Sequence, residues 1–372
     1  MMRTYKYRLY PNRRQQALLD SQLTLCREFY NAALQERIES YKTTGKGVSR
    51  YDQQRQIKEI RQIRPEFQDL YFAVMTQVLI RLDKAFKAFF RRIRHGEKPG
   101  FPRFKGRNRF NSLVFDKGVY RMEGGRLILG KVGGVKVNLH RLLPADCKTC
   151  VVKKVCGVWY ASIVCEVPTQ PLPIINKAVG IDVGLENFAV LSDGTEVSNP
   201  RFYKKAQKHQ RMCQRRVARR IKGSHRRRKA VLLLAKAGEH VRNQRRDFQH
   251  KLSHSLIAKY DTIAVEDLNV KGLAGGMLAK SVHDVGWAAF ISMLTYKAES
   301  AGRRLIAVLA SGTSQTCVCG ASVPKQLSDR MHVCPQCGIS ITRDHMSAKV
   351  ILQRALNTLS GENVDEVMSC VA

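Results

Sequence analysis

The sequence is poor in acidic residues. It contains 30 Asp and Glu against 65 Lys and Arg in 372 residues, and its formal net charge is +35. This excess is far larger than solubility requires, and its size indicates an extended polyanion such as nucleic acid better than a small acidic ligand. Apolar residues make up 44% of the chain, enough for real cores, which excludes a disordered basic arm. The length favours two or three domains.

Long hydrophobic runs and an export signal are also missing. No stretch approaches the roughly 18 apolar residues of a membrane-spanning helix, and the first ten residues lack the apolar core of a signal peptide. No lipidation signal accompanies the charge, so we expect no membrane association. Eleven cysteines without an export signal indicate thiols or metal ligands in a reducing compartment. We therefore expect a cytoplasmic protein that is associated with the nucleoid when it is bound to nucleic acid.

Hydrophobic periodicity predicts a mixed α/β chain with several domains. Up to the middle of the chain, the predicted elements are a strand at 3–10, helices at about 13–42 and 67–94, and short strands at 127–129, 135–137 and 159–164. Pro168, Pro171 and Pro173 then indicate a linker. Beyond it, the predicted elements are strands at 178–182, 188–191 and 195–197, long helices within 201–260 split near Gly223, strands at 263–265 and 305–309, and a helix at 344–356. The strand, turn, strand and hairpin that follow the linker are typical of the start of an RNase H-like domain.

Negative charge is absent from residues 201–230, which hold 14 Lys or Arg and no Asp or Glu. A solvated helix face usually mixes both signs, whereas uninterrupted positive charge repels itself and persists where phosphates neutralise it. We therefore predict that this segment contacts a nucleic-acid backbone without reading its sequence. The residues predicted to bind are Arg201, Lys204, Lys205, Lys208, Arg211, Arg215, Arg216, Arg219, Arg220, Arg226, Arg227 and Arg228.

Two cysteine pairs predict a structural zinc site. Cys334 and Cys337 are followed by Gly338, which permits a tight turn around a metal, and Cys317 and Cys319 form a pair with one spacer residue instead of two. The separation of the pairs is close to that of four-cysteine zinc ribbons. Four protein ligands leave no position for a substrate. His332 remains an alternative ligand if the Cys317–Cys319 spacing is too tight.

The other cysteines carry weaker signals. Cys147 and Cys150 have a ligand-like spacing, and Cys156 lies close by, but no second pair with a following glycine accompanies them. Packed thiols are the preferred interpretation of these three.

Three carboxylates stand in unusual contexts. Asp182 and Glu266 each follow an apolar, β-branched run that predicts a buried strand, and Asp344 opens the last predicted helix. A carboxylate at the end of a core strand is costly to desolvate unless a partner offsets its charge. Alone, each acid could be an ion-pair partner or, for Asp344, a helix cap. Together they predict two divalent cations about 3.5–4 Å apart, as used in phosphodiester cleavage.

The chain resembles the TnpB family of insertion-sequence proteins, which are related to type V CRISPR nucleases. The resemblance covers nearly the whole chain in collinear motifs. These are Tyr5-Lys-Tyr-Arg-Leu-Tyr-Pro-Asn12, Pro99-Gly-Phe-Pro-Arg-Phe-Lys105, Gly180-Ile-Asp-Val-Gly184, Asp247-Phe-Gln-His-Lys251, Val265-Glu-Asp-Leu-Asn-Val-Lys-Gly272, Thr313-Ser-Gln-Thr-Cys317, the second cysteine pair and Arg343-Asp344.

The resemblance implies a transposon-encoded, RNA-guided DNA endonuclease whose split RuvC-like domain has the RNase H fold. Asp182, Glu266 and Asp344 match the family's catalytic triad, which binds two Mg²⁺ ions with Mn²⁺ as the alternative, and the cysteines match its single Zn²⁺ site. The implied partners are a guide RNA transcribed from the right end of the element and double-stranded target DNA with its displaced strands. Base pairing would select the target beside a short transposon-adjacent motif. We expect a monomer within this complex.

By the same resemblance, the chain divides into five parts. They are a wedge-like β-barrel (1–12 and 100–172), an inserted helical recognition domain (13–99), a RuvC-like domain (173–310 and 341–358), a zinc ribbon that binds target nucleic acid (311–340) and a flexible tail (359–372). Tyr51, Phe72 and Gln77 lie where the family contacts the adjacent motif. The sequence after Asp344 departs from the family's usual Arg-Asp-Val-Asn-Ala-Ala by having His345, Met346 and Ser347.

Three other functions remain to be weighed. A guided DNA-binding repressor without cleavage is disfavoured because all three carboxylates are present. A transposase that performs strand transfer, or an accessory protein of transposition, is the second alternative, but no His or Tyr nucleophile context supports strand transfer. Nonspecific RNA binding would leave the triad unexplained.

Overall fold

The structure is a computed structural model that describes residues 1–107, 109–144, 146–169, 171–326 and 328–362. The chain divides into two compact units, Met1–Pro168 and Thr169–Ala372. The division falls in the proline-rich segment where the sequence indicates a linker. Among the described helices, none combines the length and apolar character needed to cross a bilayer.

The first unit is built on a seven-stranded antiparallel sheet of order β2-β6-β7-β1-β5-β4-β3. Its strands are β1 (Met2–Tyr10), β2 (Ser112–Asp116), β3 (Tyr120–Glu123), β4 (Arg126–Leu129), β5 (Gly133–Asn138), β6 (Cys147–Val155) and β7 (Val158–Glu166). Tyr5, Tyr7 and Leu9 of β1 are buried while their neighbours are partly or fully exposed, as the alternation predicts. β2, β3 and β6 were not predicted, and Cys147 and Cys150 lie on β6 as packed strand thiols.

Helices cover the core of this sheet. They are α1 (Arg13–Thr44), α2 (Arg50–Arg55), α3 (Ile57–Ile63), the 3₁₀ helix η1 (Pro65–Asp69) and α4 (Phe72–Arg94). α1 begins at a capping box in which Asn12 accepts from the Gln15 amide and Gln15 accepts from the Asn12 amide. The helix predicted at 67–94 starts later, at Phe72, because Tyr71 has extended backbone between η1 and α4.

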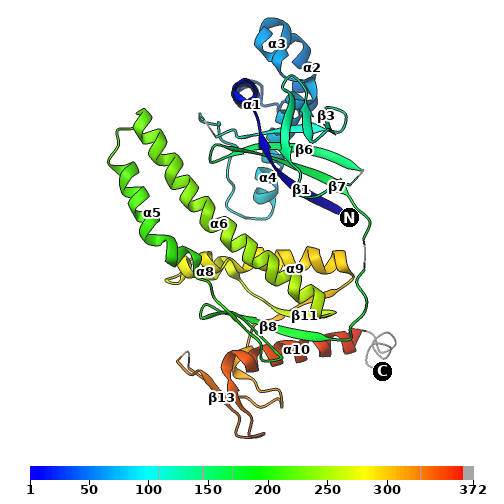
Figure 1. The fold of residues 1–372 in the computed structure, drawn as a ribbon, viewed down its shortest axis with the longest axis vertical. Coiled ribbons are helices and arrows are strands. Elements are labelled where there is room, and N and C mark those ends of the chain that lie inside the picture. The colour runs from blue at the N-terminus through cyan, green and yellow to red at the C-terminus, as the bar shows by residue number, and fades with distance from the viewer. Residues whose placement is uncertain (108, 145, 170, 327, 363–372) are drawn as a thin grey trace. The chain divides into compact units, whose positions relative to one another are not determined.

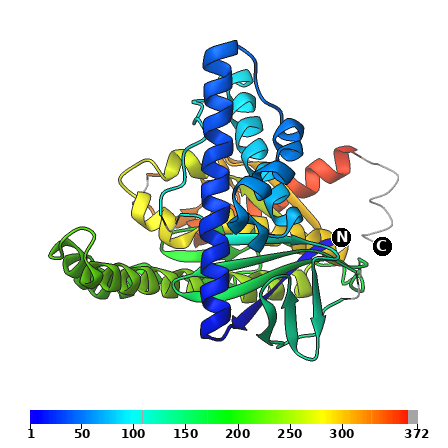
Figure 2. The ribbon, with the colours of Figure 1, turned by 90° about the horizontal axis from the view of Figure 1, so that it is seen from above.

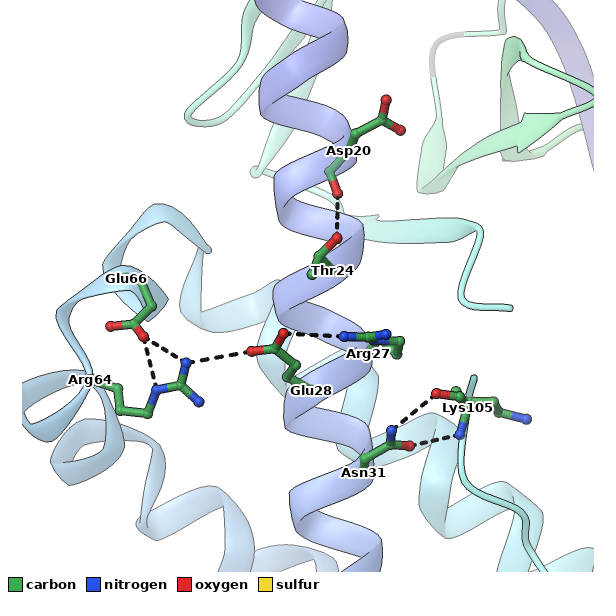
Figure 3. A network of polar contacts seen from close by, with 8 residues as sticks. All are labelled: Asp20, Thr24, Arg27, Glu28, Asn31, Arg64, Glu66 and Lys105. Atoms are coloured by element: carbon green, nitrogen blue, oxygen red, sulfur yellow. Dashed lines mark hydrogen bonds and ion pairs between the residues drawn. The ribbon is translucent and has the colours of Figure 1, made fainter. Parts of the chain in front are cut away.

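Polar contacts attach two irregular segments to α1 (Figure 3). The Asn31 amide donates to the Lys105 carbonyl at 3.1 Å and accepts from the Lys105 amide at 2.7 Å, which fixes the Pro99–Lys105 motif on the helix. Arg64 pairs with Glu28 of α1 and with Glu66 of η1. The paired Arg64 and Glu66 side chains are exposed and contribute little stability, so the Asn31 contact is the more specific anchor.

The second unit contains a five-stranded sheet of order β10-β9-β8-β11-β12. Its strands are β8 (Ala178–Val183), β9 (Asn187–Leu191), β10 (Glu196–Ser198), β11 (Thr262–Asp267) and β12 (Arg304–Leu309). β8, β9 and β10 are antiparallel, whereas β11 runs parallel to both β8 and β12. All five strands were predicted, because β-branched residues and the Asp193-Gly194 turn mark them clearly.

Helices cover both faces of this sheet, as Figure 1 shows for α9 and α10. The helices are α5 (Phe202–Ala218), α6 (His225–Lys259), α7 (Val270–Leu273), α8 (Ala279–Val285), α9 (Trp287–Ala301) and α10 (Arg343–Glu362). One core holds Ile181 and Phe188 of the sheet with Phe290 of α9. On the opposite face, Ala264 of β11 packs with Ile351 and Ala355 of α10.

Gly180 allows α10 to lie directly on the sheet. A Cβ atom built at this position would overlap the Ala348 carbonyl oxygen and lie 2.8 Å from the Leu352 amide nitrogen. Only glycine fits a backbone contact this close. α10 also continues through residues 359–362, which the sequence assigned to a flexible tail, because its helical pattern runs on to Glu362. The rest of that tail lies outside the described residues.

Candidate active site and cysteine ribbon

The carboxyl ends of two adjacent parallel strands bring Asp182 and Glu266 together. Ile181 of β8 pairs with Val265 of β11, so the next residue of each strand is a carboxylate. Asp344 reaches the same place from the first turn of α10, where the partial positive charge of the helix N-terminus favours an acidic side chain. The structure therefore places the three acids, which are far apart in the sequence, at one end of the sheet.

Burial dominates the electrostatics of Asp182 and Glu266. Burial raises the pKa of Asp182 well above its usual value, and the charges of Glu266 and Asp344 raise it further, while Arg343 opposes the rise. Burial also raises the pKa of Glu266, against a hydrogen bond from Thr313 and the charge of Arg354. Such crowding of negative charge is unfavourable without a cation.

Thr313 and Arg354 were not identified from the sequence as site residues. Thr313 starts the 3₁₀ helix η2 (Thr313–Gln315), and its hydroxyl donates to Glu266 Oε1 at 2.5 Å. Arg354 of α10 donates to the carbonyl oxygens of Leu309 and Ser311 at 2.9 and 2.8 Å. The only sequence signal for Thr313 is its place in the Thr313–Cys317 motif, directly before the first cysteine pair.

The residues that follow Asp344 have packing roles. His345 Nε2 lies 3.1 Å from the Ser192 carbonyl oxygen, and Ser347 donates to the Arg343 carbonyl oxygen at 3.1 Å. Met346 is fully buried in a small core that it shares with Cys317, Cys334 and Val350. Of these three residues, Met346 therefore attaches the cysteine segment to α10.

Four cysteines form a compact cluster beside α10. The sulfur atoms of Cys317, Cys319, Cys334 and Cys337 all lie within 4.8 Å of one another. Two of the separations, Cys317 to Cys337 and Cys319 to Cys334, are 3.6 Å. Among the described residues, no other group of three or more Cys, His, Asp or Glu ligand atoms is this close, and the three carboxylates are spread more widely.

Each cysteine pair lies in a turn that a following glycine closes. Gly320 donates to the Cys317 carbonyl and Gly338 donates to the Cys334 carbonyl, each at 2.9 Å, and both glycines have positive φ. The amide of Cys337 lowers the pKa of Cys334 to about 6. Hydrogen bonds of this kind stabilise a thiolate, the form that binds metals. The one-residue spacer is therefore compatible with a ligand pair.

His332 is not part of this cluster. It lies buried on β13 (Met331–Val333), which pairs with β14 (Ser340–Thr342), and its Nδ1 contacts Lys325 Nζ at 2.5 Å. Since all four sulfur atoms converge, the alternative in which His332 replaces a cysteine is not needed.

The basic segment forms a helical hairpin of α5 and α6 (Figure 2). Asp284 anchors its base by accepting from the Tyr203 amide and from Arg245. All the predicted nucleic-acid contacts on this segment are exposed except Arg227. Arg227 instead donates to the carbonyl oxygens of Val217 and Arg220, and so closes the end of α5. The segment therefore exposes eleven of the twelve predicted cationic contacts, all except Arg227.

The three residues predicted to contact an adjacent motif differ in their availability. Tyr51 and Phe72 are 62% and 41% exposed. Gln77 donates to both carboxylate oxygens of Asp116 at 2.9 and 2.8 Å, which ties α4 to β2. Tyr51 and Phe72 can bind a partner as they stand, whereas Gln77 would first have to leave Asp116.

Three family models match parts of the chain. One described as "Probable transposase" (OrfB_IS605) matches residues 162–276, and one described as "Cas12f1-like, TNB domain" matches residues 287–351. A third, described as "Helix-turn-helix domain", matches residues 1–46. Those residues are all described, and they form β1 and the single long helix α1, so a helix-turn-helix is not present there.

Two relatives extend over nearly the whole chain, and both carry the name "Putative RNA-guided DNA endonuclease". The first, from Streptomyces pristinaespiralis, is 30% identical over 365 residues, which cover 95% of this chain and 89% of the relative. The second, InsQ of Escherichia coli (strain K12), is 28% identical over 373 residues, with 94% and 92% covered.

A solved structure shares the fold. It is the cryo-EM structure of the Cas12f1–sgRNA–target DNA complex, whose protein has a TM-score of 0.61 and 12% identity, with 94% of this chain and 98% of that chain covered. At this identity the match shows the fold alone.

Proposed function

Because the chain belongs to the TnpB family of insertion-sequence proteins, we propose that it is an RNA-guided, metal-dependent DNA endonuclease of the RuvC type. The observation that carries the proposal is the convergence of Asp182, Glu266 and Asp344 at one end of the second unit's sheet. The names of the two long relatives and the shared fold with Cas12f1 support the same function.

The acids suit a pair of magnesium ions. Carboxylate oxygens are the hard ligands that Mg²⁺ prefers, and cations would relieve the repulsion that raises the pKa of Asp182. The three carboxylates together would hold two such ions. We assign Asp182, Glu266 and Asp344 as the ligands, with Mn²⁺ as an alternative metal. When bound, these ions supply charge stabilisation to phosphodiester hydrolysis.

The chain's own residues hold the site and its substrate in place. Parallel register fixes Asp182 beside Glu266, and the contact of α10 with Gly180 sets the position of Asp344. The exposed cations of the α5–α6 hairpin would neutralise the phosphates of the RNA or DNA backbone, with no acidic residue between 201 and 230 to repel them. Sequence recognition would come from base pairing with the guide.

The cysteine cluster suits one zinc ion. A tetrahedron with Zn–S bonds of roughly 2.3 Å has edges of roughly 3.8 Å, close to the two observed separations of 3.6 Å. We assign Cys317, Cys319, Cys334 and Cys337 as its ligands. Four sulfur ligands complete the coordination, so the role of the zinc is structural.

Replacing Cys334 by Ser should remove zinc and lower the melting temperature. The protein should contain about one zinc per chain, since a single tetrahedral site is present, and the variant well below that. The substitution removes one thiolate ligand, and the small buried core around Met346 then loses the cross-link that the zinc provides. Metal analysis and thermal unfolding measure both effects. Cys156→Ser, outside the cluster, should retain zinc, and a zinc-free wild type would contradict the assignment.

The remaining parts of the complex follow from the same proposal. We assign residues 1–12 and 100–172 to a wedge-like domain, 13–99 to a recognition domain, 173–310 and 341–358 to the nuclease domain, and 311–340 to the ribbon. Tyr51 and Phe72 are exposed candidates for contacts to a transposon-adjacent motif.

Co-purified RNA tests the guided function directly. The protein, expressed with its flanking element, should retain a uniform transcript with a variable 3′ portion. The complex should cut matching double-stranded DNA, and EDTA should stop the cutting because the site needs divalent ions. A uniform RNA without cutting would instead indicate a guided repressor, and RNA without any common sequence would contradict guidance.

A further inference from the structure

We propose that Thr313 is a positioning residue for Glu266, which sets the affinity of the active site for its divalent ions. This inference rests on the proposed nuclease function only for the role of the ions, which is to support DNA cleavage. Thr313 Oγ1 donates to Glu266 Oε1 at 2.5 Å, within the range of short hydrogen bonds to charged oxygens. No described residue donates to Glu266 Oε2, so that oxygen is left for a cation.

The hydroxyl of Thr313 is committed to this contact. The residue is 4% exposed, so water does not compete freely for the hydroxyl. Its oxygen also lies 3.0 Å from the Ala310 carbonyl oxygen. A hydroxyl has one hydrogen to donate, and the shorter contact to the charged carboxylate is the stronger of the two. Thr313 therefore restricts the rotation of the Glu266 carboxylate.

Two other groups hold the segment that carries Thr313. Arg354 donates hydrogen bonds to the carbonyl oxygens of Leu309 and Ser311, which precede Thr313 in the chain. Lys325 donates to the Ser314 carbonyl oxygen at 2.8 Å from the other side. These contacts fix the backbone around Thr313 independently of its side chain, so the contact of that side chain with the Glu266 carboxylate is preorganised.

This arrangement links the acids of the site. Arg354 lies on α10, the helix that carries Asp344 in its first turn. The same helix therefore positions Asp344 directly and Glu266 through the 309–313 segment. Cys317 follows four residues after Thr313, so the segment leads straight into the cysteine cluster. Thr313 therefore connects this segment to the carboxylate of Glu266.

Thr313→Val removes the hydroxyl at nearly constant volume and tests the proposal. Two quantities are measured on the assembled ribonucleoprotein: Mn²⁺ affinity without target DNA, by electron paramagnetic resonance titration, and the Mg²⁺ concentration for half-maximal cleavage. The Mn²⁺ dissociation constant and the half-maximal Mg²⁺ concentration should each rise by about tenfold or more, since the loss of a hydrogen bond to a charged group has an effect of about this size. Cleavage at saturating Mg²⁺ should return close to the wild-type rate.

Two further variants separate positioning from a general structural role. Thr313→Ser keeps the hydroxyl and should restore wild-type Mn²⁺ affinity. Thr316→Val removes a hydrogen bond to the Gly312 carbonyl oxygen within the same segment, without touching Glu266, and should also keep that affinity. Unchanged Mn²⁺ affinity in Thr313→Val, or an equal loss in Thr316→Val, overturns the proposal.

The Mn²⁺ titration also distinguishes this inference from the proposed function. If the wild type never cuts DNA but Thr313→Val still weakens Mn²⁺ binding, the nuclease assignment fails and the positioning role stands. If the wild type cuts and Thr313→Val matches it in both constants, the positioning role fails alone. Equal zinc content in all variants confirms that the cysteine cluster is intact.

Discussion

Asp182→Ala should abolish DNA cleavage by the guided complex while leaving RNA binding unchanged. Asp182 is the penultimate residue of the central strand β8 and interacts electrostatically with both Glu266 and Asp344, so its loss removes the proposed ligand that interacts with both other acids. Glu266→Ala and Asp344→Ala should have the same effect, because each removes a metal ligand that nothing else replaces. Cleavage of a plasmid target and gel-shift binding of the co-purified RNA measure the two properties.

A carboxylate elsewhere on the same sheet provides the control. Glu196 of β10 is exposed and lies two strands from β8, where its carboxylate accepts from Asn187 at 2.9 Å. Glu196→Gln should therefore cut DNA at the wild-type rate. Wild-type cutting by any of the three alanine variants would remove the basis of the active-site assignment.

Gly180→Ala should destabilise the second unit strongly and displace α10. The new methyl group would overlap the Ala348 carbonyl oxygen, a backbone atom that cannot rotate away. Overpacking of this kind costs about 1–3 kcal/mol and occasionally more, and we expect the upper end. For a unit of this size, a loss of about 3 kcal/mol lowers the melting temperature by roughly 6–12 °C. Cleavage should fall with it, because α10 carries Asp344.

Gly238→Ala is the matched control for this substitution. Gly238 lies within α6, and a Cβ at that position would meet nothing within 4 Å. Alanine is favoured over glycine in a helix by roughly 0.5–1 kcal/mol, so this variant should be slightly more stable than the wild type. Equal melting temperatures for Gly180→Ala and the wild type would show that α10 does not pack as closely as described.

Several elements could be predicted from local pattern because their signals are strong. The strands β8, β9, β11 and β12 are short runs of mostly apolar residues, and α5 and α6 are long helices separated by Gly223. The helices α2, α3, α7, α8 and α9 were missed. The first four have seven residues or fewer and too little periodicity to be recognised, and α9 is apolar at most positions and shows no clear polar face. β2 and β3 are short, with five and four residues, and β6 lacks a clear alternation, so their pairing partners in the sheet stabilise all three as strands.

The sites show the same division between local and tertiary information. The strand-ending carboxylates and the paired cysteines were identifiable because their chemistry is unusual at those positions. Their supporting residues were not: Thr313 and Met346 are ordinary residue types whose roles depend on Glu266 and on the cysteine cluster beside them. Likewise, only the structure shows that Arg227 donates to the carbonyl oxygen of Val217 in α5 and that Gln77 donates to Asp116.

By itself, the sequence determined a large excess of positive charge, three acids at unusual positions and four cysteines with ligand-like spacing, from which nucleic-acid contact and metal binding are predicted. Charge, spacing and residue type are properties of the chain and survive in any conformation. The tertiary structure decided which acids converge, that Cys319 rather than His332 completes the thiol cluster, and how α10 joins the two sites. Those outcomes depend on strand register and on backbone contacts such as Gly180 with Ala348, which local residue patterns do not encode.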